Sequence, residues 1–134
     1  MTGAEAGARG ATILAVEDEP LNRRLLHAVL EPAGYRIVDA PSLAAARERL
    51  REETPDLVLL DLRLPDGSGL DLAREIRTTE ATRSLPVLAA TANVMPDVLT
   101  EAREAGCDAF LSKPISPGAL LAELRRWLPA RAGQ

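Results

Sequence analysis

The chain has 134 residues, a length at which one domain can bury a hydrophobic core of its own. The formal net charge is −4, so the composition offers no overall basic surface of the kind that recommends DNA or RNA as a partner. The single Cys107 excludes an internal disulfide, and because neither a signal peptide nor a membrane-length apolar stretch is visible, we expect a cytoplasmic protein that binds no membrane.

The first half of the chain predicts two strands and two helices. An apolar run at 13–16 predicts a strand, and Pro20 then starts a helix that carries an apolar stripe. The stripe consists of Leu21, Leu25, Leu26, Val29 and Leu30. Gly34 ends this helix, a second strand follows at 35–39, and Ser42 caps the second helix.

The second half predicts three further strand and helix pairs. Short apolar runs indicate strands at 57–60, 87–90 and 109–111. A loop at 63–67 precedes the third helix, and the fourth helix, at 96–105, ends at Gly106. Its apolar stripe is thin, so we expect it to be the least firmly docked helix. Ser116 caps the fifth helix.

Five strand–helix units in succession indicate an α/β fold. Right-handed crossovers between them produce a doubly wound, five-stranded parallel sheet, for which the flavodoxin-like strand order 2-1-3-4-5 is expected. The strand that ends near Asp39 then lies at the edge of the sheet, outside any shared site. We expect this (βα)5 domain to cover residues 11–128, between tails at 1–10 and 129–134.

The other four strands each end at charged or hydroxyl residues. These residues are Glu17-Asp18, Asp61, Thr91 and Lys113. Parallel sheets of this kind place their chemistry beyond the carboxyl ends of the strands. We therefore expect these side chains to converge at one site.

The three carboxylates of this group predict a metal site. At about 4 Å and an effective dielectric constant of about 20, each pair of like charges repels by roughly 4 kcal/mol, so the cluster needs a cation. A few oxygen ligands suit Mg²⁺, whereas Ca²⁺ prefers more of them. The alternative for the run Glu17-Asp18-Glu19 is a solvated acidic turn.

Asp61 and Lys113 suggest phosphoryl chemistry. Asp61 ends the most apolar run and precedes a Pro-Asp-Gly turn, which is the position of a nucleophile that could form an acyl phosphate. Lys113 is the only lysine among 16 lysines and arginines, and its compact charge suits contact with a small anion. A lysine placed there by chance is the alternative. No Gly-rich nucleotide loop is visible, so a nucleotide is not the expected donor.

Together these residues resemble the receiver domain of two-component response regulators. The resemblance covers about residues 13–128 and rests on Glu17-Asp18, the Thr91-Ala92 pair and the segments LVLLDLRLPDGSG and DAFLSKP. It implies that Asp61 accepts a phosphoryl group from a phosphohistidine on a histidine kinase or phosphotransfer protein. It also implies Mg²⁺ held by Asp18, Asp61 and the carbonyl of Arg63, with Glu17 acting through water.

The resemblance assigns roles to the remaining residues of the site. Lys113 is expected to pair with the phosphoryl oxygens, and its bond to Pro114 is expected to be cis. Thr91 is expected to donate its hydroxyl to a phosphoryl oxygen. The backbone amides of Arg63 and Ala92 are expected to complete the set of donors around the phosphoryl group. A switch is implied in which Thr91 moves and Phe110 turns inward. Simple core packing is the alternative for Phe110.

The surface of the first helix also receives a role from the resemblance. Asn22 and Arg23 are expected to meet the histidine donor. The segments EDEPLNRRLL and TANVMPD resemble receivers of single-domain cell-cycle regulators and of hybrid kinases more than those of transcription factors.

We therefore expect a phosphorylation-activated switch rather than a conventional enzyme. With no output domain after the fifth helix, it would signal by contacts with an unknown downstream protein, as a monomer or a weak phosphorylation-dependent dimer. One alternative is a receiver-like module that binds partners without phosphorylation. A haloacid-dehalogenase-type phosphatase is a weaker alternative, since it needs a second Asp where this chain has Arg63.

Overall fold

Three strands are buried along their whole length in the computed structural model, which describes residues 10–128. They are β1 (Thr12–Val16), β3 (Leu57–Asp61) and β6 (Val87–Thr91). With β2 (Arg36–Ala40) and β7 (Ala109–Ser112) at the edges they form one parallel sheet in the order β2-β1-β3-β6-β7. This is the expected flavodoxin-like order, which is confirmed.

The register brings the carboxyl ends of the central strands level with one another. Leu60 of β3 lies opposite both Val16 of β1 and Ala89 of β6. Thr91, at the end of β6, pairs with Ser112 of β7. The residues that follow these strands therefore emerge at the same edge of the sheet.

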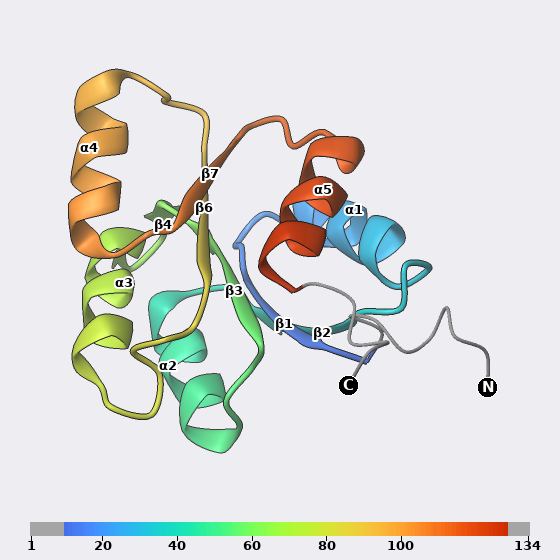
Figure 1. Cartoon of the computed structure of the whole chain (residues 1–134), viewed down its shortest axis with the longest axis horizontal. Helices are drawn as coiled ribbons and strands as arrows, with labels where there is room; N and C mark the ends of the chain where they lie inside the picture. The colour runs from blue at the N-terminus through green and yellow to red at the C-terminus, as the bar shows by residue number, and fades with distance from the viewer. Residues whose placement is uncertain (1–9, 129–134) are drawn as a thin grey trace.

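Helices cover both faces of the sheet (Figure 1). On one face lie α1 (Pro20–Leu30) and α5 (Pro117–Trp127), and on the other lie α2 (Leu43–Glu52), α3 (Gly69–Thr78) and α4 (Pro96–Ala105). Alternate residues of one strand point to opposite faces, so Val58 and Leu60 of β3 pack toward α2 and α3 while Leu57 and Leu59 pack toward α1 and α5. The apolar runs thus supply two cores at once.

Side-chain caps start three of the helices. The hydroxyls of Ser42 and Ser116 accept hydrogen bonds from backbone amides at 3.1 and 3.3 Å, as predicted for α2 and α5. Ser68 caps α3 in the same way. Gly106 ends α4 in the left-handed conformation, with φ of 112°.

The first helix begins at Pro20 as predicted, but its end and the burial of its apolar stripe differ from the prediction. It ends at Leu30, four residues before Gly34, which lies in the following turn with φ of 97°. Leu26 and Leu30 are buried, but Leu21 and Leu25 are 68% and 41% exposed. The predicted apolar stripe is wrong at these two leucines because the first turns of α1 lie beside the site, where Leu25 lines a cavity instead of the core.

A short hairpin replaces the loop predicted at 63–67. Strands β4 (Arg63–Leu64) and β5 (Gly67–Ser68) pair antiparallel around the Pro65-Asp66 turn. The sequence shows no apolar run or alternation there, since each strand has two residues. The hairpin matters because it directly follows Asp61.

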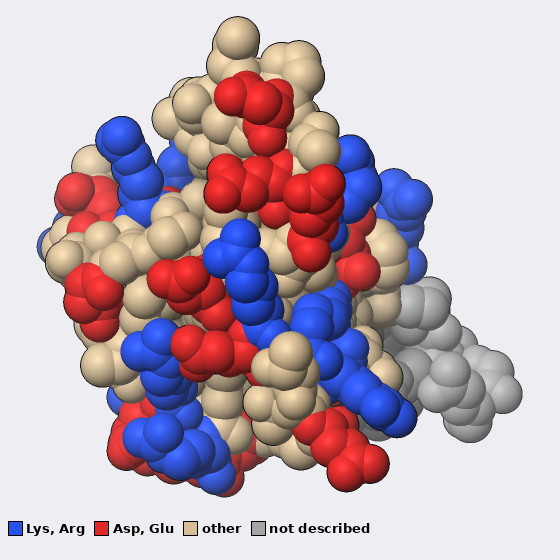
Figure 2. All heavy atoms as spheres, turned by 90° about the vertical axis from the view of Figure 1, so that its left-hand side faces the viewer, with Lys and Arg blue, Asp and Glu red and all other residues tan. Residues whose placement is uncertain are grey.

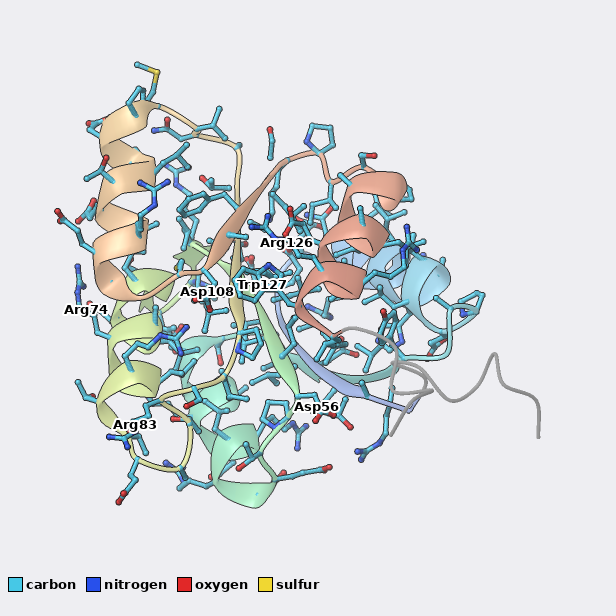
Figure 3. The ribbon with its side chains drawn as sticks, in the orientation of Figure 1. Asp56, Arg74, Arg83, Asp108, Arg126 and Trp127 are labelled. Carbon is cyan, nitrogen blue, oxygen red and sulfur yellow. The ribbon has the colours of Figure 1, made fainter. Side chains whose placement is uncertain are left out.

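A clamp from α3 fixes the far end of α4, which buries only the two alanines Ala102 and Ala105 along its own length. The guanidinium of Arg77 donates to the Gly106 carbonyl at 3.0 Å and pairs with Asp108, labelled in Figure 3, at 2.6 Å. The prediction that α4 docks least firmly stays a prediction.

Charged side chains of both signs share the face formed by α3 and α4 (Figure 2). Several charged side chains of α3 form ion pairs, as Glu75 does with Arg47 of α2 at 2.7 Å and Asp71 with Arg74 of α3 at 3.2 Å. These pairs are exposed, so each contributes at most about 1 kcal/mol.

The ends of the chain lie largely outside the described residues, and so do the tails predicted at 1–10 and 129–134. Gly10 is the exception, and its amide donates to the Gly34 carbonyl at 2.7 Å. Within residues 10–128, none of the helices combines the length and the apolar character needed to cross a membrane.

His27 ties α1 to the edge strand β2. Its Nδ1 lies 2.9 Å from Glu31 and its Nε2 lies 2.8 Å from Asp39. The hydrogen bond with Glu31 raises the pKa of His27 above its usual 6.5 and Asp39 adds to this, although partial burial opposes both. Folding therefore shifts the equilibrium toward the protonated ring, which can donate from both nitrogens, relative to the unfolded chain.

This geometry predicts a stability contribution that depends on pH. A group whose pKa is raised by folding stabilises fully below its unfolded pKa of about 6.5, and this effect is lost as the pH rises through the folded value. In urea unfolding, His27→Gln should lower the free energy of unfolding by about 0.5–1 kcal/mol at pH 6. At pH 9 the same substitution should lower the free energy of unfolding by a smaller amount. An equal loss at both pH values would contradict the assignment.

Candidate functional site

The structure brings the predicted strand-end residues to one edge of the sheet. The loops after β6 and β7 lie at the top of Figure 1, and those after β1 and β3 lie on the same side of the sheet. The acids of the site come from adjacent strands, β1 and β3, and the lysine follows β7. Asp56, labelled in Figure 3, lies at the opposite end of β3, where its carboxylate accepts from the Thr12 amide at 2.7 Å.

Glu17 is buried at the end of β1 and uses both carboxylate oxygens. Oε1 accepts from Lys113 Nζ at 2.8 Å, and Oε2 accepts from the Glu19 amide at 3.1 Å. Its own amide donates to the Ala40 carbonyl. Asp18 is exposed, but its carboxylate still lies within 4.8 Å of those of Glu17 and Asp61.

Asp61 ends β3 and is only 7% exposed. Its Oδ1 accepts from the Arg63 amide at 3.0 Å, and its Oδ2 lies 3.1 Å from Lys113 Nζ. Burial raises the pKa of Asp61, although the Arg63 amide and the charge of Lys113 both act to lower it. The carboxylate is therefore oriented by two donors in a poorly solvated position.

Lys113 connects the two buried acids. Burial acts to lower its pKa, but the hydrogen bond to Glu17 and the charge of Asp61 outweigh it and raise the pKa. Its backbone amide donates to the Thr91 carbonyl at 2.9 Å, and the bond to Pro114 is cis, as the resemblance predicted. The ammonium is therefore charged and held between both carboxylates.

The charges of this cluster do not balance. Three carboxylates face one ammonium, which leaves an excess of two negative charges, the charge that one divalent cation neutralises. The ligands on offer are all oxygens, which hard cations such as Mg²⁺ prefer. The residues present therefore fit a divalent metal ion.

Two features that position Asp61 escaped the sequence analysis. A Cβ on Gly69 would come within 2.3 Å of the Asp61 carbonyl oxygen, so only glycine allows α3 to start this close to β3. Asp66 accepts from the amides of Leu43 and Ala44 at 2.9 and 3.1 Å and so fastens the hairpin to the start of α2. The GSG run was a signal for Gly69, whereas the Pro-Asp-Gly turn marked Asp66 only as a turn residue and gave no sign of its bonds to α2.

Thr91 and Phe110 lie outside the cluster of acids. The Thr91 hydroxyl donates to the Asn93 carbonyl at 3.2 Å and accepts from the Asn93 amide at 3.0 Å, so it is engaged within its own loop. Phe110 is half-buried, and the guanidinium of Arg103 from α4 lies 5.3 Å from its ring centre. The Ala92 side chain lines the cavity beside the site.

This cavity, of about 350 Å³, opens between α1 and the segment after β7. Asn22 and Leu25 line it from α1, Pro114 and Ile115 line it from the other side, and Lys113 also lines it. Its wall is mostly apolar, and it directly adjoins the cluster.

The contact of Asn22 and Arg23 with a histidine donor stays a prediction, and the Arg23 side chain is hydrogen-bonded within the domain. It turns toward the loop after β1 and donates to two carbonyls there. Asn22 alone of the pair lines the cavity.

Comparison with known proteins identifies the family. The model of the response regulator receiver domain matches residues 13–125. The polar-differentiation response regulator DivK of Brucella ovis is 35% identical over 117 residues, which cover 87% of this chain and 95% of DivK. The phosphate regulon transcriptional regulatory protein PhoB of Pseudomonas aeruginosa is 38% identical, but the match spans only 51% of PhoB.

Solved structures agree with this result. A putative response regulator from Chloroflexus aurantiacus superimposes with a TM-score of 0.85 at 30% identity, covering 90% of this chain and 98% of that one. A second match is the receiver domain of the sensor histidine kinase PA1611 from Pseudomonas aeruginosa, solved with magnesium in its active-site cleft. It superimposes with a TM-score of 0.82 at 34% identity, covering 89% of this chain and 98% of that one. The chain therefore belongs to the response regulator receiver family, whose domains are signalling switches of two-component systems.

The close approach at Gly69 yields a stability prediction. Gly69→Ala should lower the free energy of unfolding by about 1–3 kcal/mol in urea, because the added methyl group meets backbone that cannot move without displacing Asp61. Gly118→Ala is the matched control in α5, where a Cβ would lie 3.9 Å from Ser116 Oγ. It should be neutral or stabilising by up to about 1 kcal/mol, and similar losses for both variants would contradict the packing argument.

Proposed function

We propose that this chain is a phosphorylation-dependent switch in which Asp61 accepts a phosphoryl group from a phosphohistidine. The donor is a histidine kinase or a histidine phosphotransfer protein of a two-component pathway or phosphorelay. The observation that carries the proposal is the nearly buried Asp61 carboxylate, which is oriented by the Arg63 amide and contacted by Lys113 within a cluster of acids.

The transfer requires a nucleophile that is already in position. A carboxylate oxygen of Asp61 attacks phosphorus while the phosphorus–nitrogen bond of the donor breaks, and the electron pair of that bond returns to the imidazole. The product is an acyl phosphate on Asp61. The Arg63 amide fixes the carboxylate beforehand, which reduces the reorganisation that the reaction demands.

Three residues would surround the transferred group. Lys113 exchanges its contacts with Glu17 and Asp61 for phosphoryl oxygens, which carry more charge. The Thr91 hydroxyl, which now donates to a loop carbonyl, rotates to donate to one phosphoryl oxygen. The amides of Arg63 and Ala92 complete the set of donors.

The cluster of acids would hold Mg²⁺. Asp18, Asp61 and the carbonyl of Arg63 are the proposed direct ligands, and Glu17 acts through water. When bound, Mg²⁺ neutralises negative charge on the phosphoryl group during transfer. The excess of acid over base in the cluster supports this assignment.

The signal would pass through Thr91 and Phe110. Movement of the Thr91 hydroxyl toward the phosphoryl group vacates space beside β7, and Phe110 turns inward to fill it. Arg103 of α4 lies over the Phe110 ring, so this rotation also changes a contact of α4. Because α4 buries only two alanines, a shift of this helix costs little free energy.

Contacts with other proteins would carry the signal onward. The cavity beside Lys113 and the exposed Leu21 and Leu25 of α1 form a largely apolar surface next to Asp61, suited to the phosphohistidine donor. We further propose that the chain is cytoplasmic, acts on a downstream protein rather than nucleic acid or membrane, and is a monomer or a weak phosphorylation-dependent dimer.

Intact mass spectrometry tests the acceptor directly. After incubation with Mg²⁺ and acetyl phosphate, the protein should gain the mass of one phosphoryl group, and Asp61→Asn should gain none. Lys113→Ala should be phosphorylated roughly 100-fold more slowly, because one donor to the transferred group is lost. Asp71→Asn, which alters an exposed acid of α3, is the control and should match the wild type.

The same experiment separates the alternatives. An adduct that persists in Asp61→Asn would contradict the assignment of the acceptor. If neither acetyl phosphate nor a phosphorylated phosphotransfer protein modifies a chain that binds Mg²⁺, the chain is a receiver-like module that binds partners without phosphorylation.

A further inference from the structure

The side chain of Arg23 binds two consecutive carbonyls of the loop after β1. Its NH1 donates to the carbonyl oxygens of Glu17 at 3.0 Å and Asp18 at 2.9 Å. Its backbone amide makes the ordinary first helical hydrogen bond, to the carbonyl of the N-cap residue Glu19, at 3.0 Å. A side chain on the first turn of α1 thus joins the backbone of Glu17 and Asp18 to the helix.

The start of α1 lacks the side-chain cap that three of the other described helices have. The residue at its N-cap, Glu19, makes no side-chain cap hydrogen bond, in contrast to the serine caps of α2, α3 and α5. The guanidinium of Arg23 is the side chain that instead joins the loop to the helix.

We propose that Arg23 is a positioning residue for the acidic cluster, and this rests on the proposed Mg²⁺ site. The carboxylates of Glu17, Asp18 and Asp61 offer oxygens within 4.8 Å of one another and repel each other when no cation is bound. Lys113 restrains Glu17 and Asp61. The carboxylate of Asp18 makes none of the hydrogen bonds found among residues 10–128, so its place depends on the backbone that Arg23 holds.

The contacts of the Arg23 guanidinium do not neutralise the charge of the carboxylates. Arg23 donates to carbonyl oxygens and forms no ion pair with the cluster within residues 10–128. A positive charge this close to the acids repels an incoming cation. A positioning role and a purely electrostatic role therefore predict opposite effects of removing the side chain, weaker binding in the first case and tighter binding in the second.

The neighbouring Arg24 provides the matched control. It is exposed on the same helix turn, and Arg24→Gln changes the net charge by the same amount as Arg23→Gln. By isothermal titration calorimetry, Arg23→Gln should bind Mg²⁺ roughly 10-fold more weakly than wild type, while Arg24→Gln stays within about 2-fold. Arg23→Lys, which keeps the charge and can donate to both carbonyls, should recover part of the loss.

Hydrogen exchange provides a second measurement, which is made on the metal-free protein. Hydrogen exchange of the Glu19 amide, which donates to Glu17 Oε2, should be faster in metal-free Arg23→Gln than in wild type or Arg24→Gln, while exchange in β3 and β6 is unchanged. Equal exchange at Glu19, or Mg²⁺ binding in Arg23→Gln as tight as in Arg24→Gln, would overturn the proposal. A wild-type chain that binds no Mg²⁺ would defeat the proposed function, and the Glu19 exchange would still decide whether Arg23 orders the loop.

Discussion

The ammonium of Lys113 is the contact on which the rest of the site depends. It lies 2.8 Å from a buried carboxylate oxygen of Glu17 and 3.1 Å from one of Asp61. Glu17 directly follows β1, and Asp61 is the last residue of the adjacent strand β3. Two acids cannot remain charged at such depth without a partner, because burial and mutual repulsion both favour protonation. The level register of β1, β3 and β6 places the acids together, and the segment after β7 supplies the charge that allows it.

Around this contact, one part of the site is tightly fixed and another is loosely held. Gly69 and Asp66 fix the hairpin after Asp61, and Arg23 holds the loop after β1. The proposed switch residues are different, since the Thr91 hydroxyl is bonded only within its own loop among the described residues and Phe110 is only half-buried. If Asp61 is the phosphoacceptor as proposed, a fixed carboxylate beside less firmly held neighbours would let one covalent change alter a distant surface.

Sequence reasoning reached the sheet and the strand-end residues because both follow from local patterns. The apolar runs indicated the strands, right-handed crossovers indicated a doubly wound sheet, and the flavodoxin-like order was the one expected for such a sheet. What it missed depends on contacts that leave no periodic signal. Arg23 acts through hydrogen bonds to backbone carbonyls, and Gly69 is required by a close approach to the Asp61 backbone. Leu21 is exposed because no core lies beneath the first turn of α1.

The most direct test of the central claim is ¹⁹F NMR of the protein with beryllofluoride, which mimics a phosphoryl group on a carboxylate. With Mg²⁺ present, the account predicts bound fluorine resonances in the wild type, none in Asp61→Asn, and weaker binding in Lys113→Gln. Bound resonances that persist in Asp61→Asn would contradict it, and so would binding that is independent of Mg²⁺ and of Lys113.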